Sequence, residues 1–269
     1  MTDVRDQIFA GIRNRRYRAV LTPERDGILS GLAEAGQTAE TLGLEWKCTV
    51  AEGGRLEKGV PFAELVAGPK QIAMAEEQLI GTLAKASGIA TAAKRAVDAA
   101  AGSVQIVSGS WKKMPPSLKG MVRQAISTGG ASFRICQPPM LYIDKNFIRM
   151  FGSIPAALEA VAEQTEPTKI IQIKGMTCPV QEETRQALAG GANILMVDTG
   201  RLEDLEACQT ELVRLDARSR VQVAFAGNVH LTDIPDMARR GVDLLCIGKE
   251  IVDAGLLDMK LDVVEEIKA

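Results

Sequence analysis

From residue 102 onward the sequence alternates between short apolar runs and longer amphipathic stretches, and this alternation restricts the possible folds more than any other feature. Near-continuous apolar runs are typical of parallel strands that are buried on both faces. The runs lie at residues 104–109, 131–136, 169–174, 193–198, 221–227 and 243–248. Because helical patterns separate them, the sequence predicts a βα barrel, or an open βα array, rather than a sandwich.

The first part of the chain has a different pattern. Residues 44–67 contain short β-prone stretches separated by glycines, which predict a small antiparallel sheet. Residues 72–101 predict one long helix, since apolar side chains recur there at helical spacing. The face expected to be buried comprises Ile72, Ala75, Leu79, Leu83 and Ala86. We therefore expect an α/β protein with an N-terminal domain at 1–102 and a barrel domain at 103–255. The last stretch, 256–269, predicts either strand or helix and is expected to return to the first domain.

Charge and hydropathy narrow the functional classes. A net charge of −2 and a pI of about 5.7 argue against a nucleic-acid or membrane-surface partner. No apolar run approaches the roughly 20 residues of a membrane-spanning helix, and the charged N-terminus lacks a secretory signal. The five cysteines show no metal-binding spacing, so we expect reduced thiols in a cytoplasmic protein.

Two glycine-containing loops follow the last two apolar runs, at Gly227–Asn228 and Gly248–Lys249. In a βα barrel the chemistry lies at the C-terminal ends of the strands, and the last loops often bind phosphate. Glycine lets backbone N–H groups approach an anion, and Lys249 adds a cation. These loops predict a phosphate-binding end, with the alternative that the glycines only turn the chain.

Other charged residues belong to the same predicted end. Lys112 and Lys113 follow the first run and could hold a diphosphate or a carboxylate, or lie in a solvated loop. Arg134 lies inside the second run, so it predicts either an anionic ligand or an internal salt bridge. Asp198 ends the fourth run and could bind Mg²⁺ or a ribose hydroxyl, or cap the next helix. The single histidine, His230, is expected to have a structural or surface role.

Taken together, these segments resemble the quinolinate phosphoribosyltransferase family (nicotinate-nucleotide pyrophosphorylase, carboxylating). Residues 87–91 (SGIAT) carry the most specific match. Further matches are Lys113, Pro116, Gly129–Gly130, Asn146, the MVD ending at Asp198, the glycine of AGNV, and residues 241–261. Their order and spacing hold over roughly residues 20–265.

The resemblance implies a type II phosphoribosyltransferase fold, in which an α/β sandwich packs against an open α/β barrel. It also implies homodimers that build each site from both subunits. Quinolinate would attack carbon 1 of phosphoribosyl diphosphate (PRPP), Mg²⁺ would accompany the diphosphate with weak help from Asp198, and loss of carbon dioxide would give nicotinate mononucleotide. Lys113 and Asp198 are the implied catalytic residues, and no tightly bound cofactor is expected.

Several positions depart from the family pattern. The family's long-helix arginine, which reaches the partner's substrate carboxylate, is Glu77 here. Its lysine before Asp-Asn-His is Asp144, the histidine of its His-Arg pair is Phe133, and its strand glutamate is Gln172. Its arginine after the first strand is Lys112, which keeps the charge but loses the bidentate fork.

These departures change the expected acceptor. Opposite-sign changes beside a carboxylate weaken dicarboxylate binding, whereas Lys113 and Arg134 are kept. Trp111 and Phe133 are large and flat, in a protein of which only 4% is aromatic. We expect a flat acceptor with at most one carboxylate, with Trp111, Lys112, Phe133, Arg134 and Glu77 near it. The alternative is a non-catalytic phosphate- or nucleotide-binding protein on the same scaffold.

Overall fold

The computed structural model describes residues 3–268, which form two compact units. Unit 1 contains the described residues up to Arg95, residues 111–130 and those from Ile251 onward. Unit 2 contains residues 96–110 and 131–250. Within residues 3–268, no helix is both long enough and apolar enough to cross a membrane.

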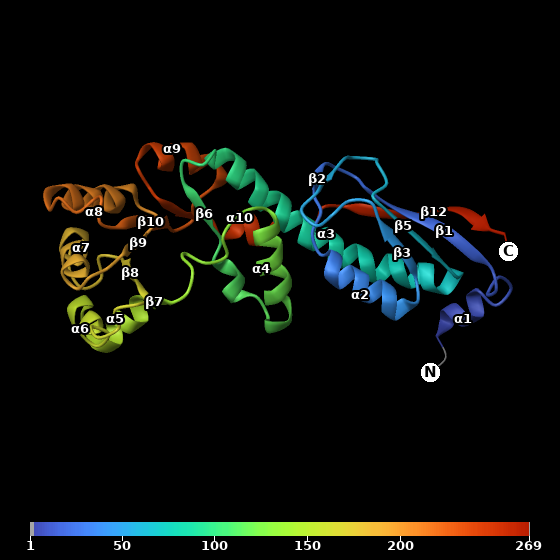
Figure 1. The fold of residues 1–269 in the computed structure, drawn as a ribbon, viewed down its shortest axis with the longest axis horizontal. Helices are drawn as coiled ribbons and strands as arrows, with labels where there is room; N and C mark the ends of the chain where they lie inside the picture. Colours follow the sequence, from blue (N-terminus) through green and yellow to red (C-terminus); the bar gives the residue numbers. More distant parts are fainter. Residues whose placement is uncertain (1–2, 269) are drawn as a thin grey trace. The chain divides into compact units, whose positions relative to one another are not determined.

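Unit 1 is built on an antiparallel sheet with the order β12-β1-β5-β3. Its strands are β1 (Arg16–Pro23), β3 (Glu45–Cys48), β5 (Ala63–Ala67) and β12 (Met259–Ile267). The register between β1 and β12 runs from Arg16 opposite Ile267 to Pro23 opposite Met259, so the C-terminal stretch does return to this sheet as a strand (Figure 1). A second small sheet pairs β2 (Gly27–Ile28) with β4 (Arg55–Leu56).

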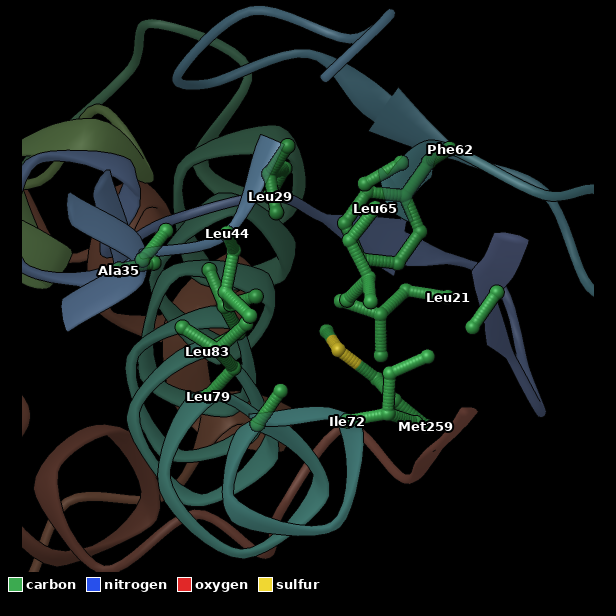
Figure 2. Close-up of a cluster of buried hydrophobic side chains, with 14 of the residues drawn as sticks. Leu21, Leu29, Ala35, Leu44, Phe62, Leu65, Ile72, Leu79, Leu83 and Met259 are labelled. Atoms are coloured by element: carbon green, nitrogen blue, oxygen red, sulfur yellow. The ribbon is translucent and has the colours of Figure 1, made fainter. Parts of the chain in front are cut away.

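One core holds this unit together, between the sheet and two helices, α2 (Leu32–Leu42) and α3 (Pro69–Ala100). Leu21 and Leu65 from the strands meet Leu79 and Leu83 from α3 (Figure 2). All five positions predicted to form the buried face of the long helix are buried, with exposed fractions of 7% or less. Truncating one such leucine to alanine typically costs about 2–5 kcal/mol, so this face anchors the helix to the sheet. The remaining helices of unit 1 are α1 (Val4–Ile8), η2 (Pro116–Leu118) and α4 (Lys119–Thr128), together with η1 (Ser110–Lys113) from Trp111 onward.

Unit 2 is a six-stranded parallel sheet with the order β6-β11-β10-β9-β8-β7, which confirms the predicted α/β class. Its strands are β6 (Gln105–Val107), β7 (Met140–Ile143), β8 (Thr168–Ile173), β9 (Ile194–Asp198), β10 (Gln222–Ala226) and β11 (Leu244–Cys246). Its helices are α5 (Lys145–Phe151), α6 (Ile154–Glu159), α7 (Val180–Ala189), α8 (Leu202–Arg214), η3 (Leu231–Asp233) and α9 (Ile234–Arg239), and α10 (Lys249–Val252) follows β11. Helices α7 and α8 lie against β8 and β9 (Figure 1). Apolar side chains from successive strands, among them Ile170, Met196 and Leu244, form the core on the other face.

One predicted strand is wrong. Residues 131–136 form only an isolated bridge, between Ser132 and Val107, and the strand lies further on at β7, followed by the equally unexpected α5. The reason is local: the Ser132 hydroxyl accepts from the backbone N–H of Arg134 and donates to the carbonyl of the same residue. These bonds compete with a strand ladder. Pro138 and Pro139, which cannot donate to a ladder, then separate this loop from β7.

Candidate active site

The carboxylate of Asp198 lies at the C-terminal end of β9 and is held by the neighbouring strand. The side-chain amide of Gln172, on β8, donates from Nε2 to Oδ2 of Asp198 at 2.5 Å. Its Oε1 accepts from the backbone N–H of Lys145 at 2.6 Å. Because Gln172 is only 7% exposed and both ends of its amide are engaged, its orientation is fixed. Asp198 is therefore aimed by Gln172, while its side chain remains about a third exposed, at 32%.

Lys174 is the second residue that holds this carboxylate. Its ammonium lies 3.6 Å from Oδ2 of Asp198 and also donates to the main-chain oxygen of Asp198. The loop that carries Lys174 is fixed by Glu183 of α7, which is 2% exposed. The two oxygens of Glu183 accept from the backbone N–H groups of Lys174, Gly175, Met176 and Thr177 at 2.7–3.0 Å.

The sequence pattern predicts no particular role for Lys174 or Glu183. The position of Glu183 was a usable indication, because a carboxylate in the first turn of a helix is suited to accept from nearby backbone N–H groups. Lys174 follows a predicted strand, but nothing in its neighbours along the chain points to Asp198. The alternative that Asp198 caps the next helix is wrong: the N-cap of α8 is Arg201, without a side-chain cap bond, and the Arg201 N–H donates to Thr199.

The glycines after β9 and β10 are required by close contact between two loops. Gly200 donates its N–H to the carbonyl of Ala226 at 3.0 Å, and a Cβ on Gly200 would lie 2.4 Å from the carbonyl oxygen of Gly227. Gly200, Gly227 and Asn228 all have positive φ, at 70°, 115° and 55°. After β11, a Cβ on Gly248 would lie 2.3 Å from the Ser110 hydroxyl. Close packing is therefore sufficient to explain why glycine is needed at these positions. Phosphate binding at these loops stays a prediction.

His230 ties the β10 loop to α10. Its Nε2 lies 3.2 Å from Nδ2 of Asn228, and its Nδ1 lies 2.6 Å from Oε1 of Glu250. The backbone N–H of Leu231, and next the imidazole of His230, hold the pKa of Glu250 below its usual range. These contacts give His230 a structural place in the loop, next to Lys249, which is exposed at the start of α10.

The residues predicted to lie near the acceptor belong to different units. Trp111, Lys112 and Lys113 lie in η1 and are assigned to unit 1, where the guanidinium of Arg123 lies over the Trp111 ring, 5.0 Å from its centre. Both lysines are exposed. The side chain of Glu77 is 61% exposed on α3.

Glu77 has an ion-pair partner that the sequence did not indicate. The guanidinium of Arg5, on α1, lies 2.5 Å from Oε2 of Glu77. The charge reversal at this position is thus partly offset within the same chain.

Arg134 and Phe133 belong to unit 2. Because residues 131–136 are a loop, the expectation of an arginine buried inside a strand is wrong: Arg134 is half-buried, and its guanidinium lies 5.0 Å from the centre of the Phe133 ring. Asp144, at the position of the family's lysine, caps α5 by accepting from the backbone N–H groups of Asn146 and Phe147.

A resident Mg²⁺ does not fit the donor set at Asp198. Across residues 3–268, no group of three or more His, Cys, Asp or Glu side chains could hold a metal ion. Oδ2 of Asp198 already faces an amide N–H and an ammonium, which repel a divalent cation. Mg²⁺ prefers octahedral oxygen ligands, so the protein offers it at most one carboxylate oxygen here.

A parallel βα sheet with a fixed carboxylate and glycine loops after its strands belongs to the α/β class of proteins that place their chemistry at the carboxyl ends of the strands. The sequence profile described as quinolinate phosphoribosyl transferase, N-terminal domain, matches residues 3–87, and that of the C-terminal domain matches residues 89–262. The chain belongs to the quinolinate phosphoribosyl transferase family and is thus a pentosyltransferase, as predicted.

Relatives of known sequence and structure agree with this assignment. The chain is 27% identical to nicotinate-nucleotide pyrophosphorylase [carboxylating] of Homo sapiens, over 91% of this chain and 81% of the human protein. It is 26% identical to the probable enzyme of that name from Methanothermobacter thermautotrophicus, over 93% and 90%. The solved nicotinate-nucleotide pyrophosphorylase of Francisella tularensis has the same fold, with a TM-score of 0.83 and 21% identity over 98% of this chain and 91% of that one.

Proposed function

We propose that this protein transfers the phosphoribosyl group of PRPP to the ring nitrogen of a heteroaromatic acid. The nitrogen lone pair forms a bond to carbon 1 of the ribose while the bond from carbon 1 to the diphosphate oxygen breaks, and diphosphate leaves with the electron pair. The names of the relatives support this reaction. The observation that carries it is Asp198, held by Gln172 and Lys174 at the end of β9.

The remaining roles follow from charge and position. Asp198 would accept hydrogen bonds from ribose hydroxyls, and Lys113, with Lys112, would neutralise the leaving diphosphate. The Gly227–Asn228 and Gly248–Lys249 loops would hold the 5′-phosphate through backbone N–H groups. Any Mg²⁺ would arrive on the diphosphate as part of the substrate.

For the acceptor, we propose a flat heteroaromatic ring with at most one carboxylate. Glu77, Asp144 and Phe133 stand where the family has two cations and a histidine. Arg5 offsets the charge of Glu77 but is itself engaged by that ion pair, so it is not a free counter-charge for a second carboxylate. Arg134 and Lys113 remain for one anionic group, and the rings of Trp111 and Phe133 would stack on the acceptor.

The reaction is tested by measuring diphosphate release from PRPP with quinolinate, with monocarboxylate pyridines and with neutral heteroaromatics. We expect turnover with at least one monocarboxylate and a reduction of about 100-fold in Asp198→Asn, with Asp204→Asn of α8 as the matched control. PRPP binding without diphosphate release for any acceptor would favour the non-catalytic alternative. Efficient conversion of quinolinate to nicotinate mononucleotide would overturn the acceptor proposal.

We also propose that the protein acts in the cytoplasm as a homodimer, or a higher homo-oligomer, in which Glu77 approaches the partner's barrel. This rests on the family resemblance. Light scattering at micromolar concentration tests it, and a monomer there would contradict it.

A further inference from the structure

The polar network of Asp198 contains a cation of its own. Oδ2 of Asp198 accepts from Gln172 and lies 3.6 Å from Nζ of Lys174, so an amide and an ammonium occupy the approach to this oxygen. Gln172 is neutral, so it adds no second negative charge that would attract a divalent ion. The electrostatics at this end of β8 and β9 are those of a lysine–carboxylate pair.

Lys174 is held in place before any ligand binds. Glu183 is almost fully buried and accepts four backbone N–H groups of the loop from Lys174 to Thr177, as well as the hydroxyl of Thr177 at 3.1 Å. A loop fixed in this way loses little conformational entropy when a ligand arrives.

The lysine also keeps unused hydrogen-bonding capacity. An ammonium has three N–H donors, and in the described chain only the main-chain oxygen of Asp198 accepts from Lys174. Its side chain is 27% exposed. Oδ1 of Asp198 has no hydrogen bond among residues 3–268, so a donor and an acceptor are available side by side. This pair complements a phosphate oxygen next to a hydroxyl group.

We propose that Lys174 contacts the phosphate groups of the substrate and supplies the positive charge that a metal ion would otherwise supply at Asp198, so that ribosyl phosphates and diphosphate bind here without a divalent cation. This inference adds a binding role for Lys174 to the proposed function, and its relevance to catalysis rests on that function. Fixed ammonium groups bind phosphate as point charges, and a neighbouring carboxylate selects a ligand that also carries a hydroxyl.

The experiment is a calorimetric titration of the full chain with inorganic diphosphate and with PRPP, each in EDTA and in MgCl₂. Lys174→Met removes the charge and keeps the stem. Lys169→Met, at the other end of β8, is the matched control. In the wild type we expect the diphosphate Kd to agree within about threefold between the two buffers, and Lys174→Met to weaken binding in EDTA by about tenfold or more. Lys169→Met should bind like the wild type.

Circular dichroism shows whether Lys174→Met is folded. If it is not, a second variant still tests the proposal. Gln172→Glu places a second carboxylate beside Asp198 and should make diphosphate binding depend on Mg²⁺. The proposal is overturned if the wild type fails to bind diphosphate, or if it binds diphosphate in EDTA about tenfold or more weakly than in MgCl₂. It is also overturned if folded Lys174→Met binds diphosphate in EDTA like the wild type.

The two proposals fail in different ways. Metal-independent diphosphate binding that needs Lys174, without turnover of PRPP, would remove the proposed function and leave this inference standing. Turnover that requires Mg²⁺ and is unchanged in Lys174→Met would support the proposed function and overturn this inference.

Discussion

At the scale of single residues, the glycines at the ends of β9 and β10 show how a backbone contact can demand one residue type. The Gly200 N–H donates to Ala226, and its Cα lies so close to Gly227 that no side chain fits between them. In the sequence, the glycine of the Gly227–Asn228 loop predicted phosphate binding, whereas the structure gives a reason for this glycine that requires no ligand. Both reasons select glycine, so its presence cannot by itself identify a phosphate site.

We expect Gly200→Ala to destabilise the protein more than Gly191→Ala does. Both glycines have positive φ, 70° and 81°, which costs an alanine about 1–2 kcal/mol. Only at Gly200 would the added Cβ also meet backbone, at 2.4 Å, whereas nothing lies within 4 Å at Gly191. Urea unfolding of the two variants gives the comparison, and equal losses would contradict the contact argument.

At the scale of elements, one buried carboxylate joins α7 to α8. Glu211 on α8 is 4% exposed and is paired with Arg214 of its own helix at 2.6 Å and with Arg185 of α7 at 3.0 Å. The hydrogen bonds from Arg214 first, and then those from Arg185, lower the pKa of Glu211 to about 2. The charged form is therefore the one that stabilises the packing of these helices.

The pH dependence follows from the direction of that shift. Because the folded-state pKa is below the ordinary value of 4.5, the stabilisation is complete above about 4.5 and is lost as the pH falls towards 2. We expect Glu211→Gln to lower the free energy of unfolding by about 2 kcal/mol at pH 7, with a smaller difference at pH 3. Glu203→Gln, on the same helix but 77% exposed, should change little at either pH. A pH-independent difference for Glu211→Gln would show that its charge is not the cause.

At the scale of the whole molecule, unit 1 is assembled from segments at both ends of the chain. β12 pairs with β1 along eight positions, and Met259 and Leu257 belong to the core of unit 1. Unit 1 therefore cannot be completed until the last residues are available.

We expect a chain truncated after Asp258 to lose the hydrogen-exchange protection of residues 16–23. Without β12, β1 becomes an edge strand whose N–H groups are open to solvent. Val264→Thr is the control, because Val264 is 46% exposed and lies at the irregularity in the register, without a partner on β1. Exchange measured by mass spectrometry gives the answer, and full protection of β1 in the truncated chain would contradict the prediction.

The family and most of the fold could be predicted because they depend on patterns that are local in the sequence. Apolar runs and helical spacing identified the buried face of α3 and five of the six parallel strands. The exception is residues 131–136, where pairing with β6 is limited to Ser132. Apolar composition cannot show that the Ser132 hydroxyl bonds to the backbone of Arg134, where a strand would have continued.

Of the site, the sequence determined the carboxylate Asp198, the glycine loops and the changes from the family pattern, since each is a property of one residue in a recognisable segment. Only the tertiary structure decided which charges meet. Gln172 and Lys174 reach Asp198 from positions 26 and 24 residues away, and Arg5 reaches Glu77 across 72 residues. Such pairs depend on how strands and helices are brought together, and no local pattern encodes them.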